Sequence, residues 1–271
     1  MSDESKIRDV VDAVTGVAKA IPVYEDVLQP AAKEIGKGLQ TVAKSIHVAL
    51  APVSVLVWGY DQVKEFVSTK VADRLKNVKP EDIVTPKPNV AGPVLEALRY
   101  TGHEESLSDL YANLLATSMD KNTASSAHPA FAEIIKQLTP DEAKLISLFV
   151  LDIPLPLLTV RNEYRPGLAN KTGGFDVLVN VSTLGQQAGC DHPELVPTYI
   201  DNLCRLGLAE VPEIYKYTGA GIYDELEKSM QPVVQAIENA NPERRGVLHR
   251  KALIVSVLGK QFARVCVTPK S

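Results

Sequence analysis

The spacing of apolar residues along the chain predicts consecutive amphipathic helices. One apolar stripe lies in the middle of the sequence and consists of Leu107, Leu110, Tyr111, Leu114, Leu115 and Met119. A second stripe follows His128-Pro129 and consists of Phe131, Ile134, Ile135 and Leu138. Because apolar residues three or four positions apart share one face of a helix, both stripes predict helices that pack into a common core.

The next helix is predicted by its capping residues. Thr139 can accept a hydrogen bond from the backbone N–H of Glu142, and the Glu142 carboxylate can bond back to the N–H of Thr139. Pro140 between them is suited to the first turn, where its missing N–H is not needed. We therefore expect a helix after Thr139 that directs Ile146 and Phe149 inward.

The same pattern divides the chain into regions. Residues 1–78 carry two further apolar stripes at helical spacing, which predict an N-terminal amphipathic helical region. Residues 79–93 contain four prolines and are expected to form an extended connector. A central helical bundle is predicted over 94–160, and a separate domain over 161–271.

The domain over 161–271 combines short helices with short strands. Strands are predicted at 175–181, 208–211 and 252–257, with one helix ending near Gly189 and another ending at Gly207. A helical insertion is expected over 212–250. This order resembles a winged helix, so the expected fold is mainly α with a winged-helix-like α+β part at the C-terminus.

Composition and charge exclude several classes. The chain has 271 residues, of which 45% are hydrophobic and 23% charged, as in an ordinary globular protein. Its net charge of −4 gives no general attraction to nucleic acid or anionic lipid. The three cysteines lie far apart and favour reduced thiols over a disulfide framework.

The local charges do not favour sequence-specific DNA binding. The predicted recognition segment from Asp191 to Gly207 holds three carboxylates against Arg205 alone, whereas duplex binding requires several cations at phosphates. A basic cluster does occur further on, at Arg244, Arg245, Arg250 and Lys251. It is interpreted either as a solvated turn or as a patch for an anionic partner.

The stretch 45–60 has no formally charged residue and ends in aromatic side chains. It is too short to span a bilayer and contains Pro52. Its apolar residues can form buried core, or they can face a membrane or a protein partner. The candidate face consists of Ile46, Leu50, Val53, Val57 and Trp58.

Signatures of an enzyme are sparse. Gly36 and Gly38 lack the third glycine and the preceding strand of a phosphate-binding loop. Cys190 and His192 have no second pair at zinc-binding spacing, and a nucleophile and its base normally come from separate segments. We therefore expect no catalytic residue, no metal and no cofactor.

Several segments of the chain resemble the Abi-alpha (abortive infection alpha) family of bacterial proteins. The resemblance is carried by Leu110–Ala116, by His128–Phe131 with Ile134–Asp141, and by Leu258–Phe262 with Cys266. It implies a helical protein of phage defence and supplies no catalytic residues. We expect a non-enzymatic antiphage protein in the cytoplasm or at the inner membrane, acting on a phage or host protein or a membrane surface, with homo-oligomerisation an open option. The alternative is a winged-helix DNA-binding regulator.

Overall fold

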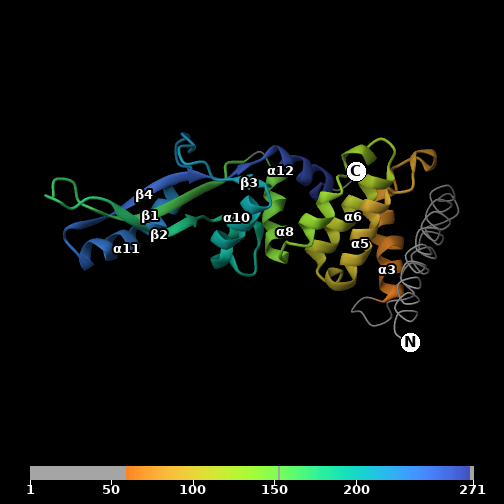
Figure 1. Cartoon of the computed structure of the whole chain (residues 1–271), viewed down its shortest axis with the longest axis horizontal. Coiled ribbons are helices and arrows are strands. Elements are labelled where there is room, and N and C mark those ends of the chain that lie inside the picture. Colours follow the sequence, from red (N-terminus) through yellow and green to blue (C-terminus); the bar gives the residue numbers. More distant parts are fainter. Residues whose placement is uncertain (1–58, 152, 269–271) are drawn as a thin grey trace, which may run out of the picture. The chain divides into compact units, whose positions relative to one another are not determined.

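The structure is a computed structural model that describes residues 59–151 and 153–268 (Figure 1). It is mainly α-helical with a small amount of antiparallel sheet, as the sequence predicts. The described residues form two compact units, one of 59–138 with 265–268 and the other of 139–264. The expected boundary at 160/161 therefore differs from the one observed.

The first unit is a helical bundle around α6. Its elements are α3 (Tyr60–Phe66), the π-helix η1 (Val67–Val71), α4 (Ala72–Leu75), the 3-10 turn η2 (Pro80–Asp82), α5 (Pro88–Thr101), α6 (Glu105–Met119), the 3-10 turn η3 (Ala124–Ser126) and α7 (Ala130–Ile135). The π-helix η6 (Ala263–Val267) contributes its last residues. All six residues of the predicted α6 stripe are buried, and Tyr111 and Leu114 are fully so. Phe131 of α7 is also fully buried, which confirms both predicted stripes.

The prediction of an extended connector over 79–93 is wrong in its second half, because α5 begins at Pro88. Pro88 occupies the first turn, where no N–H is required. Pro93 lies inside the helix and removes one of its hydrogen bonds. The burial of Val94 and Leu98 offsets that loss, since both are 0% exposed.

The second unit combines a sheet with short helices. Its helical elements are α8 (Pro140–Ile146), η4 (Ser147–Val150), α9 (Leu184–Ala188), η5 (Pro193–Leu195), α10 (Val196–Arg205), α11 (Asp224–Ala240) and α12 (Val257–Phe262). The strands β1 (Pro156–Tyr164), β2 (Gly174–Val181) and β4 (Arg244–Ala252) form an antiparallel sheet in the order β2-β1-β4. A separate pair joins β3 (Ala209–Glu210) to β5 (Ile254–Val255).

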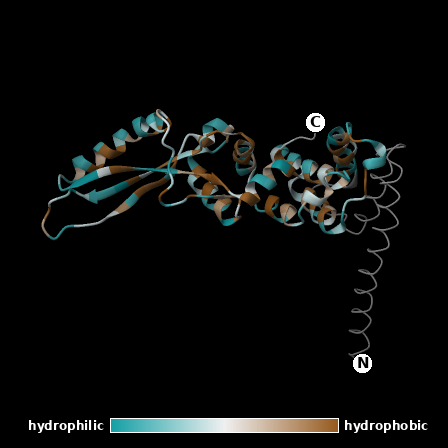
Figure 2. Ribbon diagram, turned by 90° about the horizontal axis from the view of Figure 1, so that it is seen from above, coloured by the Kyte–Doolittle hydropathy of each residue, from teal (hydrophilic) through white to brown (hydrophobic). Residues whose placement is uncertain are grey.

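Helix α11 covers one face of the three-stranded sheet. It is amphipathic, with hydrophobic and hydrophilic residues alternating along its length (Figure 2), and it buries Leu226 and Ile237. Gly246 of β4 lies directly under it, because a Cβ atom added there would come within 2.9 Å of the Val234 Cα. A glycine at this position therefore allows the helix to approach the strand closely.

Two strands differ from the expected layout. Strand β1 starts inside the range predicted for the central bundle, 94–160, and continues through residues expected to form a loop. Its first five residues are all buried, so they lack the alternation that identifies a half-buried strand. The insertion over 212–250 is not only helical, because most of β4 follows α11. The strands predicted at 175–181, 208–211 and 252–257 are confirmed in position by β2, β3 and β5.

The predicted capping box opens α8. The Thr139 hydroxyl accepts from the Glu142 N–H, and a Glu142 carboxylate oxygen accepts from the Thr139 N–H at 2.6 Å. The next carboxylate, Asp141, is 4% exposed and accepts from the backbone N–H groups of Asp191 and His192 at 2.8 Å each. This single side chain therefore joins α8 to the loop before α10.

Candidate functional site

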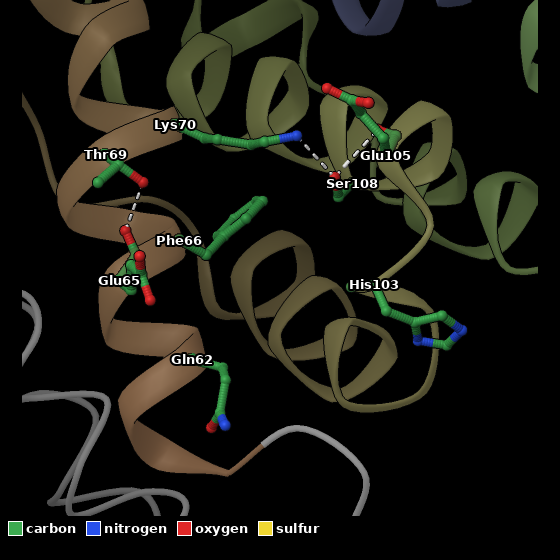
Figure 3. Close-up of a pocket in the computed structure, with 9 residues that line it drawn as sticks. Gln62, Glu65, Phe66, Thr69, Lys70, His103, Glu105 and Ser108 are labelled. Atoms are coloured by element: carbon green, nitrogen blue, oxygen red, sulfur yellow. Dashed lines mark hydrogen bonds between the residues drawn. The ribbon is translucent and has the colours of Figure 1, made fainter.

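The largest pocket of the first unit lies between α3, η1 and the start of α6 and has a volume of about 360 Å³ (Figure 3). It is lined by Gln62, Glu65, Phe66, Thr69, Lys70, Gly102, His103, Glu105 and Ser108. Figure 3 shows the Phe66 ring directed into the space between the helices, with the Lys70 side chain extending towards Ser108. The pocket therefore combines an aromatic floor with polar walls.

Lys70 and Ser108 form the closest polar pair in this pocket. The Lys70 ammonium donates to the Ser108 hydroxyl at 2.9 Å. It also forms an ion pair with Asp109 at 2.9 Å. A lysine that activates a serine nucleophile must be neutral, whereas an adjacent carboxylate favours the charged ammonium. The arrangement supports packing of η1 against α6 rather than acyl transfer.

Behind the pocket, the polar contacts continue into the bundle. Arg74 of α4 pairs with Asp109 at 2.9 Å and also donates to the side-chain oxygen of Asn113. The Asn113 amide in turn donates to the carbonyl of Cys266 at 2.7 Å. The sequence did not reveal this network, because Asn113 lies on the apolar stripe of α6 and its partners come from distant segments.

The four cations of the expected anionic-partner patch do not form one patch. They lie on β4, where successive side chains point to opposite faces of the sheet. Arg250 points towards α11 and pairs with Glu227 at 2.9 Å, and Arg244 stacks over the Tyr164 ring at 3.9 Å. Arg245 pairs with Glu163 of β1 at 2.6 Å. Of the four, Lys251 is the one without an ion pair among the described residues.

The most exposed apolar surface of regular structure lies on β2. Within the described part of the chain this strand pairs with β1 alone, so its other edge is open. Phe175 is 55% exposed and Val179 45% exposed, with Val177 and Leu178 also exposed between them. The strand has one charge, Asp176, which is paired with Arg161 at 2.8 Å. A solvent-exposed apolar edge of this kind is suited to pairing with a strand of another chain.

Other candidate groups from the sequence are placed as follows. The face made of Ile46, Leu50, Val53, Val57 and Trp58 lies outside the described residues. Cys190 is close to Asp141 and Lys144, and its burial together with the Asp141 charge raises the pKa of the thiol to about 11. All three cysteines are free thiols, as expected.

Two further findings concern residues 59–151 and 153–268. No cluster of three or more His, Cys, Asp or Glu side chains is arranged there to hold a metal ion. None of the helices in this part combines the length and apolar character that crossing a bilayer requires.

Comparison with known proteins identifies the family. No curated protein matches the chain. One solved structure, an uncharacterized protein from the hydrocarbon-degrading marine bacterium Alcanivorax borkumensis SK2, is 19% identical and covers 55% of this chain and 96% of its own, with a TM-score of 0.33. The family model for abortive infection alpha matches residues 59–266, which include both units. The chain therefore belongs to the abortive infection alpha family.

Proposed function

We propose that this protein acts in phage defence by binding a protein partner along the open edge of β2, without catalysing a reaction. Family membership supports the defence role. The observation that carries the mode of action is the run from Phe175 to Val179, which presents apolar side chains beside unpaired backbone groups. A partner that adds an extended strand would satisfy the backbone and cover the side chains in one step.

The composition of β2 supports binding rather than simple solvation. Natural sheets usually protect an open edge with lysine, proline or a bulge. Strand β2 has two register irregularities opposite β1, between Leu158 and Val160 and between Val160 and Arg161, but contains neither lysine nor proline. Its central residues therefore remain available for pairing.

The arrangement of ionic groups in the first-unit pocket does not compete with this proposal. A reaction at Ser108 would need a base, and Lys70 is held by Asp109. The sheet edge thus gives the better-supported mode of action, while a membrane contact through residues 46–58 remains the alternative derived from the sequence.

A phage challenge tests the proposal with a matched control. Val177→Lys/Val179→Lys places two charges on the β2 edge. Ile214→Lys/Val257→Lys places the same charges on apolar residues of the same unit that are 95% and 86% exposed. Only the β2 variant should lose protection, with both variants unfolding at the wild-type temperature. Full protection by the folded β2 variant would contradict the proposal.

A second proposal concerns the order α9, α10, β3 and β5, which we infer to be a winged helix with β4 and α11 in its insertion. The supporting observations are the left-handed φ of Gly207 (73°), which ends α10, and the antiparallel pairing of Ala209 with Val255. The charges do not support DNA recognition by it, since Arg205 is hydrogen-bonded to Asn202 and Asp201 lies on the same helix.

A further inference from the structure

The face of the sheet opposite α11 contains a cavity of about 210 Å³. It is lined by Thr159, Arg161, Asp176, Glu213, His249, Arg250 and Lys251. Thr159 and His249 are cross-strand partners in the β1–β4 pairing, so their side chains share a face. Lys251 is two residues further along β4 and points the same way.

The charges around this cavity are only partly neutralised within the protein. Arg161 is paired with Asp176 at 2.8 Å, and Arg250 turns to Glu227 on the α11 side. Neither the Lys251 ammonium nor the Glu213 carboxylate has an ion-pair partner among the described residues. One cation and one hydrogen-bond acceptor therefore line the cavity without an internal partner.

Thr159 adds an independent indication of a ligand. It is 3% exposed, yet its hydroxyl has no hydrogen-bond partner within the part of the chain that the structure describes. A buried hydroxyl without a partner is costly, and its position in the cavity wall makes it available to a bound molecule. His249, opposite Thr159, supplies a further ring nitrogen at the same place.

We infer that this cavity binds a small phosphate monoester. The phosphate oxygens accept hydrogen bonds from Lys251 and from the Thr159 hydroxyl, while Arg161 provides a second positive charge. The Glu213 carboxylate accepts a hydrogen bond from a hydroxyl on the organic part. The cavity is too small for a folded macromolecular surface to enter, which favours a small molecule.

Calorimetric titration of the full-length protein tests this inference with two probes, glycerol phosphate and inorganic phosphate. Wild type should bind glycerol phosphate more tightly. Lys251→Met and Thr159→Val should each weaken binding by about tenfold or more, as expected for loss of a charge-assisted hydrogen bond. Thr159→Ser keeps the hydroxyl and should retain affinity. Lys228→Met removes an exposed lysine from α11, outside the cavity, and should leave binding unchanged.

Tighter binding of inorganic phosphate, with the same dependence on Lys251 and Thr159, would identify free phosphate as the ligand and still support the site. Absence of binding at millimolar concentrations of both probes would overturn the inference. Equal affinity in wild type, Lys251→Met and Thr159→Val would overturn it as well. Thermal unfolding of each variant excludes misfolding as the cause, because none of these substitutions should shift the melting temperature substantially.

Discussion

The Asn113 side-chain amide on α6 donates a hydrogen bond to the main-chain carbonyl of Cys266 at 2.7 Å, across 153 positions of sequence. It also lies within 3.3 Å of the Val267 carbonyl. Both carbonyls belong to the π-helix η6, whose wide turns leave main-chain groups without the usual helical partners. A buried asparagine thus anchors the C-terminal segment in the first unit.

Asn113→Ala should therefore release this segment. Loss of the amide leaves Arg74 and two carbonyls without a partner, and we expect about 2–3 kcal/mol less stability. In a Cys190→Ser/Cys204→Ser background, alkylation of Cys266 reports the release, because burial raises the pKa of this thiol and slows its reaction in the native state. Alkylation should accelerate in Asn113→Ala but not in Asn122→Ala, which alters an exposed asparagine. Equal rates in both would contradict the anchoring role.

Asp141 should make the second unit sensitive to acid. Burial alone would raise the pKa of this carboxyl, but donations from the Asp191 and His192 backbone and from Lys144 outweigh it and hold the pKa below its ordinary value. A lowered native pKa stabilises the fold above the unfolded-state pKa, and this contribution is lost as the pH falls through the native value.

The corresponding measurement compares wild type with Asp141→Asn in urea unfolding at two pH values. At neutral pH the variant should be less stable by about 2–4 kcal/mol, because it loses charge-assisted bonds from three partners. The difference should shrink towards zero below about pH 3, where the native carboxylate is protonated. A difference independent of pH would show that the ionised form is not what stabilises α8.

The core of the first unit should be sensitive to truncation. Leu114 and Phe131 are both 0% exposed, so Leu114→Ala or Phe131→Ala should cost about 2–5 kcal/mol through lost burial and cavity formation. Leu195→Ala, at a side chain that is 45% exposed, serves as the control and should have a small effect. Thermal unfolding measures all three, and an unchanged melting temperature in both core variants would contradict the packing described for α6 and α7.

Binding to duplex DNA should be weak and without sequence preference at physiological salt. The reason is the shortage of free cations on α10, where Arg205 is already hydrogen-bonded to Asn202. A gel-shift assay with random and phage-derived duplexes measures this directly. Sub-micromolar, sequence-selective binding would favour the DNA-binding alternative instead.

Local signals in the sequence predicted the elements that depend on local physics. The capping box of Thr139 and Glu142 and the stripe of α6 need only neighbouring residues, and both are confirmed. Strand β1 could not be identified in the same way, because its buried run lacks alternation and only the pairing with β4 defines it.

The candidate site was harder to predict, because it depends on which strands pair. Four cations close in sequence are divided between two faces by the geometry of β4, and three of them are engaged by Glu163, Glu227 and the Tyr164 ring. Neither the open edge of β2 nor the cavity beside Thr159 has a local signature, since both follow from the order β2-β1-β4.

The measurement that tests the central claim most directly compares two variants in one phage challenge, with a membrane-potential dye as second readout. Val177→Lys/Val179→Lys blocks the β2 edge. Trp58→Ala/Lys37→Gln/Lys44→Gln removes the aromatic and cationic groups that the sequence suggests for a lipid surface. The account predicts that the first variant, although folded, loses protection and that the second keeps it. Protection that survives the edge variant and disappears with the second, together with altered membrane potential, would contradict it.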